Sequence, residues 1–388
     1  MNLTIIICAR DAESTIERAV ATVLRETQCR LLLVDDGCRD STVSRALALS
    51  EGRLQVVSTV SPGGIPQARQ MGLDACDTEY AAWLDADDEW ISGRANRIVE
   101  ALENGADVYS EAIDLVDGES GSLLRRLEVP VFVRMESNPA RLFERNYLPG
   151  DSQLGFRVAA FREAGGYDSE TFGAESFDIL LRAIARGASF AFGDKVGYRM
   201  VAYPNSVSRN LMRQRASLAN ALKKHDYEAV RGLCVQAGQP ERVAAWVLVS
   251  MAVFRGEMQV ALRFLDEASP VDADPDEVLE PNGPVPLCEG WRRAFQRGTC
   301  LALLGGRDDE AEAELGRAAC LKGSAEVLNN RGVVFARMGR IAEANACWME
   351  ALRVYPGYAD AKKNLNNPQI GCITTHPLRR QPSRSEYG

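Results

Sequence analysis

The first half of the chain alternates short apolar runs with amphipathic stretches, and this alternation is the feature that most limits its fold. Residues 3–8 form an apolar run, residues 14–24 carry apolar side chains at helical spacing, and residues 31–34 form a second apolar run. The alternation continues to about residue 205. Strands that alternate with helices are typical of a mostly parallel sheet covered by helices. The sequence therefore predicts a Rossmann-like α/β domain.

The second half of the chain lacks strand patterns and carries small residues at fixed offsets within helical stretches. Gly298 precedes Gly332 by 34 residues, and Leu315 precedes Trp348 by 33. A period of this length, with small, aromatic and proline residues in this order, resembles tetratricopeptide repeats. Such repeats stack helix pairs and present a concave face to peptides, protein partners or a second copy of the chain. A plain helical bundle is the alternative.

These patterns divide the chain into three parts. We predict an α/β domain over residues 1–208, an all-α tetratricopeptide-like domain over residues 209–365, and a disordered tail over residues 366–388. Residues 269–287, inside the helical domain, hold five prolines and several acidic side chains, which predicts an irregular loop. The tail is predicted to be disordered because it is polar and basic.

Composition narrows the possible partners and locations. The chain has 54 acidic and 45 basic residues and a formal net charge of -9, which does not favour nucleic acid as a partner. No run of 18 apolar residues is present, so we expect no membrane span, while peripheral association with a membrane stays open. The ten cysteines never form a CxxC pair, as expected for reduced packing residues in a cytoplasmic protein.

Two of the expected strands end in carboxylates. Asp35 and Asp36 follow the second apolar run, and Asp85, Asp87 and Asp88 follow a later one. The carboxyl ends of parallel strands face the crevice in which open α/β sheets bind ligands. Three carboxylates so close together repel one another unless a cation or solvent offsets their charge. Because oxygen ligands favour Mg²⁺ or Mn²⁺, the cluster predicts such a site, with an acidic helix cap as the alternative.

The order and spacing of several motifs resemble those of the family 2 glycosyltransferases, which have the GT-A fold. The motifs are residues 34–37 (VDDG), 40–42 (DST), 68–69 (AR), 84–88 (LDADD), 165–168 (GGYD), 198–199 (YR) and 206–208 (SVS). The resemblance covers roughly residues 1–210. It implies an inverting enzyme that moves a sugar from a nucleotide-sugar donor, in the first place a UDP-sugar, to a glycan, peptide or protein acceptor.

The resemblance also implies which residues bind the nucleotide. Asp36 would read the base, and Ala9 and Asp11 would line the same pocket. Arg69 would lie near the base or the diphosphate. Two structural alternatives stay open: Arg69 as an exposed charge on a helix, and Asp11 as the N-cap of a helix.

The later acidic cluster would bind the ribose and the metal. Asp85, with Ala86 beside it, would contact the nucleotide ribose. Asp87 would hold an Mn²⁺ or Mg²⁺ ion that bridges the diphosphate. Such a cation offsets the charge that develops on the leaving nucleoside diphosphate.

The sequence departs from the family at the catalytic base, the carboxylate that removes the acceptor proton during inversion. The family supplies it as the aspartate of a Glu-Asp pair, whereas this chain has Glu175 followed by Ser176. Glu175 is therefore the first candidate and Asp178 the second, with Asp151 and Asp168 on neighbouring loops. A first-turn helix charge is the structural alternative for Glu175. A thiol acceptor, which ionises more easily than a sugar hydroxyl, would need less help from a base.

The pairing of the two domains resembles that of bacterial S-glycosyltransferases that modify glycocin-type peptides. This favours a peptide or protein acceptor, whereas assembly of a surface polysaccharide is the commoner role of family 2 enzymes. The helical domain would bind the acceptor or form a homodimer. The alternative function is a non-catalytic scaffold, in which a degenerate transferase domain accompanies repeats that bind partners.

Overall fold

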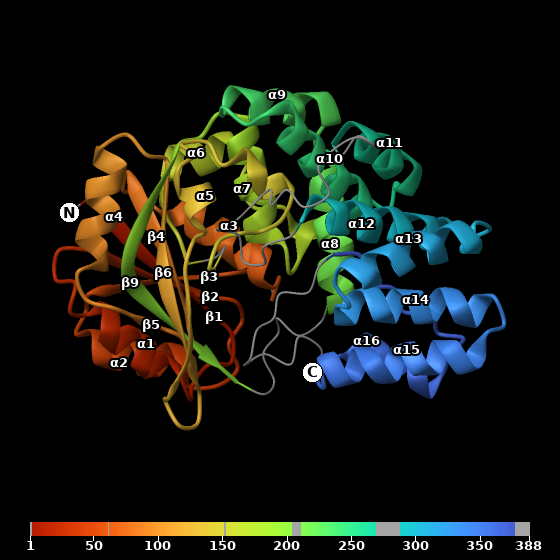
Figure 1. Cartoon of the computed structure of the whole chain (residues 1–388). Coiled ribbons are helices and arrows are strands. Elements are labelled where there is room, and N and C mark those ends of the chain that lie inside the picture. Colours follow the sequence, from red (N-terminus) through yellow and green to blue (C-terminus); the bar gives the residue numbers. More distant parts are fainter. Residues whose placement is uncertain (1, 61, 151–152, 204–210, 269–287, 377–388) are drawn as a thin grey trace. The chain divides into compact units, whose positions relative to one another are not determined.

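The computed structural model describes every residue except 1, 61, 151–152, 204–210, 269–287 and 377–388 (Figure 1). The chain forms two compact units. Unit 1 comprises Met1–Leu142 and Asn146–His225, and unit 2 comprises Phe143–Arg145 and Asp226–Gly388. The predicted proline-rich loop and the end of the predicted tail lie outside the described residues.

Unit 1 is built on one mixed sheet, whose strands run in the order β3-β2-β1-β4-β8-β6-β9-β5, with β7 paired to β6. The strands are β1 (Leu3–Ala9), β2 (Arg30–Asp35), β3 (Leu54–Ser58), β4 (Tyr80–Asp85), β5 (Glu89–Trp90), β6 (Val108–Asp117), β7 (Leu123–Leu127), β8 (Gly155–Arg157) and β9 (Phe190–Ala202). The neighbouring strands β3, β2, β1 and β4 are parallel to one another. Strand β8 pairs antiparallel with β4. The long strands β6 and β9 run side by side (Figure 1). The predicted α/β class is confirmed, with a sheet that is parallel on one side and mixed on the other.

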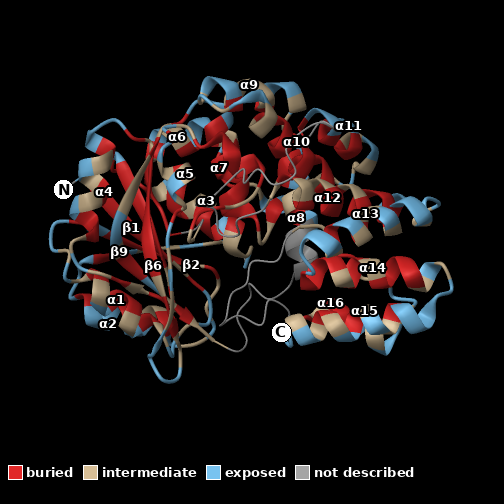
Figure 2. Cartoon of the chain, viewed as in Figure 1, coloured by how far each residue is buried: buried red, intermediate tan, exposed pale blue. Residues whose placement is uncertain are grey.

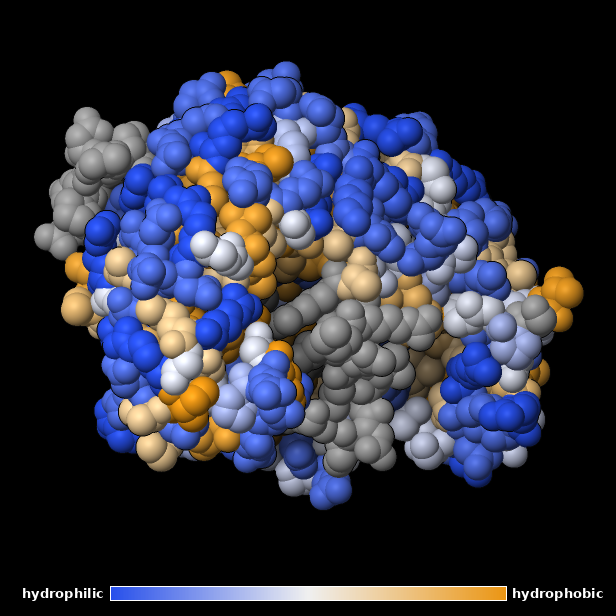
Figure 3. Space-filling view, turned by 90° about the vertical axis from the view of Figure 1, so that its right-hand side faces the viewer, coloured by the Kyte–Doolittle hydropathy of each residue, from blue (hydrophilic) through white to orange (hydrophobic). Residues whose placement is uncertain are grey.

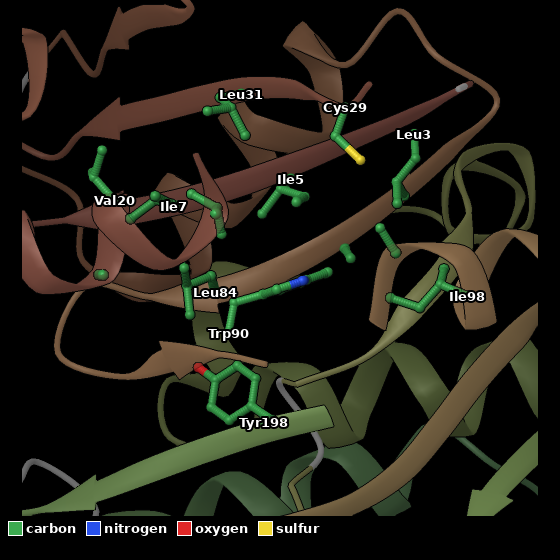
Figure 4. Packing of buried hydrophobic residues seen from close by; sticks show 14 of the residues in the cluster. Leu3, Ile5, Ile7, Val20, Cys29, Leu31, Leu84, Trp90, Ile98 and Tyr198 are labelled. Carbon is green, nitrogen blue, oxygen red and sulfur yellow. The ribbon is translucent and has the colours of Figure 1, made fainter. Parts of the chain in front are cut away.

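Helices cover both faces of this sheet. They are α1 (Ile16–Val23), α2 (Thr42–Ser50), α3 (Ile65–Ala75), α4 (Arg94–Glu103), α5 (Val131–Arg134), α6 (Val158–Glu163), α7 (Glu175–Ala185) and α8 (Leu211–Lys223), with short 3₁₀ turns η1 (Ala140–Phe143) and η2 (Ser169–Thr171). On one face, Ile5 and Ile7 of β1 pack in a cluster with Val20 of α1 (Figure 4). On the other face, Ile6 lies against Gly72 of α3, where a Cβ atom would come within 2.8 Å of it. Because both faces are covered, β1 is apolar except for Thr4 instead of alternating with polar residues.

The pairing register fixes which strand ends are neighbours. Ala9 of β1 lies opposite Asp35 of β2, and Cys8 lies opposite Asp85 of β4. The carboxyl ends of β2, β1 and β4 are therefore level. The residues that follow them leave the sheet at one edge, as the sequence predicted.

Unit 2 is helical in its described part, as predicted. Its helices are α9 (Tyr227–Gln236), α10 (Glu241–Arg255), α11 (Met258–Ala268), α12 (Glu289–Leu304), α13 (Asp308–Leu321), α14 (Ala325–Arg337), α15 (Ile341–Val354) and α16 (Ala359–Asn366). A Cβ atom at Gly298 would lie 2.7 Å from Leu315, and one at Gly332 would lie 2.5 Å from Trp348. The two glycines thus play the same part in successive helix pairs, as a repeat requires. The assignment to tetratricopeptide repeats in particular stays a prediction.

Two boundaries differ from those expected. Helix α8 belongs to unit 1 although the sequence placed it after residue 208, because Lys224 at its end pairs with Asp168 and Asp178 of that unit. The predicted disorder from residue 366 is wrong for residues 367–376. There Ile373 and Thr374 are buried, and buried asparagines bind the main chain, which a polar composition does not reveal.

Burial follows the strands and the inner sides of the helices, and exposed residues lie on loops and outer helix faces (Figure 2). The face shown in Figure 3 is mostly hydrophilic, with scattered apolar patches. Within the described residues, no helix combines the length and the apolar character needed to span a bilayer. All ten cysteines are free thiols. The cytoplasmic location and the homodimer stay predictions.

Candidate active site

Asp36, directly after β2, is buried and holds a glycine loop by its carboxylate. Its Oδ1 accepts hydrogen bonds from the Gly63 amide (2.9 Å) and the Thr59 hydroxyl (3.2 Å), and its Oδ2 accepts one from the Gly64 amide (2.9 Å). Arg10 lies 3.8 Å from Oδ2. Two carboxylate oxygens have about four acceptor positions, so Asp36 retains capacity for one further donor. Its position fits the predicted contact with a nucleotide base.

Ala9 and Asp11 lie in the loop that follows β1. The Ala9 carbonyl accepts a hydrogen bond from the Asp36 amide at 3.0 Å, so these two predicted pocket residues are in contact. The carboxylate of Asp11 accepts hydrogen bonds from the amide and guanidinium of Arg39, which lower its pKa. Asp11 is not a helix N-cap, since α1 begins at Ile16 after Thr15. It ties the loop after β1 to the loop after β2.

Arg69 is a buried cation between two carboxylates. Only 4% of the residue is exposed, and Nη2 lies 3.2 Å from Asp85 Oδ1 while Nη1 lies 3.7 Å from Glu175 Oε1. Arg69 also donates a hydrogen bond to the Ser176 hydroxyl. Burial alone would lower its pKa, but the charges of Asp85 and Glu175 outweigh that effect and raise it. The alternative of an exposed helix charge is therefore wrong, and Arg69 joins the strand ends to α7.

Asp85 keeps contact with solvent although it is held on both sides. Its Oδ2 accepts a hydrogen bond from Gln153 Nε2 at 2.8 Å, opposite the Arg69 contact at Oδ1. Its backbone amide donates to the Tyr198 hydroxyl at 3.0 Å. A third of the side chain (33%) is exposed, and the following Ala86 is buried. Asp85 is thus oriented and still open to a ligand.

Asp88 and Asp87 have opposite environments. Asp88 is buried, and its carboxylate accepts hydrogen bonds from the Val201 amide (2.7 Å) and the Tyr198 hydroxyl (2.9 Å). For Asp87, no other described residue donates a hydrogen bond to the carboxylate. Burial raises the pKa of Asp87 to about 6, and the charge of Asp85 adds to the shift. Asp88 therefore fixes β9, while Asp87 remains an incompletely compensated carboxylate.

The residues at this edge fit a magnesium-type ion better than an all-protein metal cage. In the described part of the chain, no group of three or more His, Cys, Asp or Glu side chains is placed to hold a metal. Mg²⁺ sites, however, commonly use one or two carboxylates together with waters and substrate phosphates. Asp87, with Asp85 beside it, supplies such a set.

The carboxylates of the two predicted bases on α7 differ in how many of their oxygens form ion pairs. Asp178 is fully buried, and both oxygens are paired: Oδ2 with Arg182 at 2.6 Å and Oδ1 with Lys224 at 2.7 Å. The geometry makes Asp178 a structural anchor of α7. Glu175 accepts a hydrogen bond from the Gly173 amide at 2.6 Å, and its other oxygen faces Arg69. Glu175 therefore remains the better candidate.

Asp168, the further candidate base that the structure describes, is paired with other groups. Asp168 is bound by Lys224 at 2.6 Å and by the Glu170 amide, and the Lys224 hydrogen bond lowers its pKa. Asp151 and the predicted motif at 206–208 lie outside the described residues.

Sequence reasoning missed three residues of this site. Gln153 and Tyr198 orient Asp85, and Cys8 of β1 lies between its pairing partners Val34 and Asp85 on the neighbouring strands. Burial raises the pKa of Cys8 to about 12, and the charges of Arg69, Asp85 and Asp36 all act on this thiol. Tyr198 could have been found from the sequence because it belongs to the motif at 198–199. Gln153 belongs to no motif, and its partner Asp85 is far away in sequence. The pairing of Cys8 with Val34 and with Asp85 places the end of β2 and the end of β4 on either side of β1.

Comparison with known proteins identifies a family for part of this chain. Residues 4–163 match the family model described as glycosyl transferase family 2. The succinoglycan biosynthesis protein ExoU of Rhizobium meliloti is 29% identical over 250 residues, which are 59% of this chain and 72% of that protein. The UDP-Glc:alpha-D-GlcNAc-diphosphoundecaprenol beta-1,3-glucosyltransferase WfgD of Escherichia coli is 31% identical over 121 residues, 30% of this chain and 48% of that protein.

Solved structures give a further similarity. The crystal structure of S. aureus TarS 1–349 in complex with UDP-GlcNAc aligns with 91% of this chain and 91% of its own, at 14% identity and a TM-score of 0.49. The family match covers Asp36 after β2, Arg69 of α3 and Asp85 at the end of β4. The chain therefore contains a glycosyltransferase family 2 domain, and the protein is a glycosyltransferase.

Proposed function

We propose that unit 1 binds a UDP-sugar together with Mn²⁺ or Mg²⁺ and transfers the sugar with inversion. The observation that carries this proposal is the cluster at the ends of β2, β1 and β4, where Arg69 links Asp85 to Glu175. A buried guanidinium between two carboxylates fixes the direction in which both of them point. Such a pre-oriented polar edge suits a charged ligand that must be held in one pose.

Each part of the donor has a matching group in this cluster. Asp36 and the Ala9 carbonyl lie together for the base, and Asp85 presents a partly exposed side chain for the ribose. Asp87 would hold the cation next to the diphosphate. The cation, when bound, would offset the charge on the leaving nucleoside diphosphate. The printed name of WfgD, which uses UDP-Glc, also favours a UDP-sugar donor.

Glu175 is the proposed base that accepts the acceptor proton. It begins α7 beside Arg69, whereas both oxygens of Asp178 are engaged by cations. Ser176 stands where the family has its aspartate, and its hydroxyl accepts a hydrogen bond from Arg69. We therefore assign to Ser176 the orientation of Arg69, and to Glu175 the removal of the proton from the acceptor.

The acceptor is proposed to be a glycan, with a peptide or protein as the second candidate. The names of ExoU and WfgD connect them to succinoglycan biosynthesis and to a lipid-diphosphate-linked sugar, which favours a growing saccharide. The two-domain architecture favours a peptide or protein instead.

The decisive experiment is donor hydrolysis over a panel of UDP-, GDP- and dTDP-sugars, measured as released nucleoside diphosphate with Mn²⁺, Mg²⁺ or EDTA. We expect release from a UDP-sugar that EDTA abolishes and that Asp87→Ala reduces at least about 10²-fold. Asp77→Ala is the matched control, because this exposed carboxylate pairs with Arg30 before β4 begins, at the opposite end of the strand. Activity in EDTA equal to that in Mn²⁺ would contradict the metal, and silence across all donors would favour the non-catalytic scaffold.

A further inference from the structure

After α16 the chain reverses and returns over the helices of unit 2. The turn at residues 367–371 is closed by a hydrogen bond from the Ile370 amide to the Asn367 carbonyl, and Gly371 has φ +62°. Residues 372–376, called the return segment below, then lie along α16, α14 and α10. This segment belongs to the part of the predicted tail that the structure describes.

Asparagine side chains bind the main chain of the return segment in a repeating way. Asn364 accepts from the Cys372 amide at 2.7 Å and donates to the Cys372 carbonyl at 2.8 Å. Asn330 does the same two residues later, with 2.8 Å to both the amide and the carbonyl of Thr374. Asn329 donates a further hydrogen bond to the Cys372 carbonyl at 2.9 Å. Alternate residues of an extended chain face the same side, so the two asparagines recognise backbone at the spacing of an extended peptide.

Side chains of the return segment also contact residues of these helices. The Thr374 hydroxyl donates to Asp360 Oδ2 at 3.0 Å and is hydrogen-bonded to the Tyr358 hydroxyl. The ring of His376 stacks on Phe254 of α10 with centroids 3.8 Å apart. The contacts therefore extend over three helices, with a small hydroxyl residue held at one point and an aromatic ring at another.

The asparagines also bind one another, and Asn330 donates a hydrogen bond to the Thr299 hydroxyl, but both the amide and the carbonyl that they bind outside the helices belong to the return segment. Asn329, Asn330 and Asn364 are fully buried, and asparagine is a poor helix former. A buried amide that loses a hydrogen-bond partner costs about 1–3 kcal/mol, so this face favours a bound main chain. Hydrogen bonds to backbone amides and carbonyls do not distinguish side chains. The same groups can therefore receive any extended segment that fits.

We propose that the face made by α10, α14 and α16 is a binding site for the main chain of an extended peptide, and that the return segment is its built-in occupant. The ligand is an extended segment of another polypeptide with a small hydroxyl residue at the place of Thr374. This inference does not depend on the sugar-transfer reaction.

The first test is peptide binding to a chain shortened to residues 1–370. A fluorescein-labelled peptide of residues 369–376 is titrated against the full and the shortened chain, and anisotropy is measured. We expect saturable binding to the shortened chain and at least tenfold weaker binding to the full chain, whose site is filled. N-methylation of the peptide at Thr374, which removes the amide bound by Asn330, should weaken binding about tenfold. N-methylation at Thr375, whose amide makes no hydrogen bond to a described residue, is the matched control.

Equal peptide affinity of the two chains would overturn the proposal, as would no binding to a shortened chain whose helical circular dichroism is retained. Binding that is equally sensitive to both methylations would exclude recognition of the main chain by Asn330. Concentration-dependent dimers of the full chain that disappear on shortening would assign the occupant to a second copy and overturn the intramolecular arrangement.

The second test uses the intact chain and decides the case if the shortened chain unfolds. Hydrogen exchange of residues 372–376 is measured in the full protein, in Asn330→Ala and in Asn345→Ala. Asn345 is the matched control because it makes the same chemical change on α15, where no contact to the return segment is described. We expect exchange at Thr374 to rise at least tenfold in Asn330→Ala alone. Unchanged protection in that variant would overturn the proposal.

Discussion

Two neighbouring carboxylates in the loop after β4 have different environments. The difference indicates which of them has a structural role and which is available to a metal ion. Asp88 accepts two hydrogen bonds from β9, whereas Asp87 has no other described residue that donates to its carboxylate. The raised pKa of Asp87 comes from burial and from the charge of Asp85. A cation would relieve both effects. Asp87 is therefore the residue at which metal dependence is expected.

Asp87→Ala should abolish the Mn²⁺-dependent part of UDP binding and leave the fold intact. No hydrogen bond from another described residue is lost, so the melting temperature should remain near that of the parent protein. Isothermal titration of UDP with Mn²⁺ or EDTA checks the prediction. The matched variant Asp88→Ala should instead lower the free energy of unfolding by about 1–3 kcal/mol, since Tyr198 and Val201 lose their acceptor. Unchanged UDP titration in Asp87→Ala would remove Asp87 from the site.

Glu175→Gln should lower sugar transfer by about 10²-fold or more while UDP affinity stays the same, because a positioned base contributes on that order. The control is Asp178→Asn, which leaves Lys224 and Arg182 without their buried carboxylate. That variant should lose stability on the order of 3 kcal/mol. Initial transfer rates, UDP titration and chemical denaturation check the pair. An equal loss of affinity and turnover in Glu175→Gln would mean a structural role for Glu175.

At the residue scale, the sequence predicted the strand-end carboxylates but not what surrounds them. Asp36 and Asp85 could be placed at one edge because parallel strand ends share an edge. Gln153 and Tyr198 could not, since they reach Asp85 from elements 68 and 113 residues away. The separate roles of Asp87 and Asp88 also depend on β9. The pairing of β9 cannot be predicted from the residues near Asp87 in the sequence.

The helices of unit 2 depend on glycine at the points where partners approach most closely. A Cβ atom at Gly332 would lie 2.5 Å from Trp348 Nε1, which donates a hydrogen bond to the Asn329 carbonyl. Trp348 is fully buried and cannot move without displacing its neighbours. The glycine spacing read from the sequence thus reports a packing requirement between α14 and α15.

Gly332→Ala should lower the free energy of unfolding by about 1–3 kcal/mol, the usual cost of overpacking a core. Gly232→Ala is the control on α9, where a Cβ atom would meet nothing within 4 Å. That change should stabilise the protein by about 0.5–1 kcal/mol, because alanine is the better helix former. Urea denaturation of both variants measures the difference. A stability gain in Gly332→Ala would show that α14 and α15 do not pack this closely.

At the element scale, periodicity predicted the helix pairs but not the return segment. Residues 367–376 are polar and lack periodicity, and their order comes from asparagines on α14 and α16. From the sequence alone, an asparagine within a predicted helix is expected at the protein surface. Only the fold shows that these amides are buried and bind backbone.

For the molecule as a whole, donor binding and main-chain recognition belong to different units. The residues proposed for the donor all lie in unit 1, and the asparagines lie in unit 2. UDP with Mn²⁺ should therefore slow hydrogen exchange in residues 9–11, 36–38, 63–64 and 85–88, and leave α14 and α16 unchanged. Exchange measured with and without UDP checks this division. Protection appearing on α14 instead of the strand ends would place the nucleotide elsewhere.

The central claim is that the strand ends of unit 1 form one nucleotide-sugar site around a cation. A crystal soaked with UDP and Mn²⁺ tests it most directly. We predict the base beside Asp36 and Ala9, the ribose at Asp85, and Mn²⁺ between Asp87 and the diphosphate. A nucleotide bound away from these residues, or bound here with Mn²⁺ not coordinated by Asp87, would contradict the account.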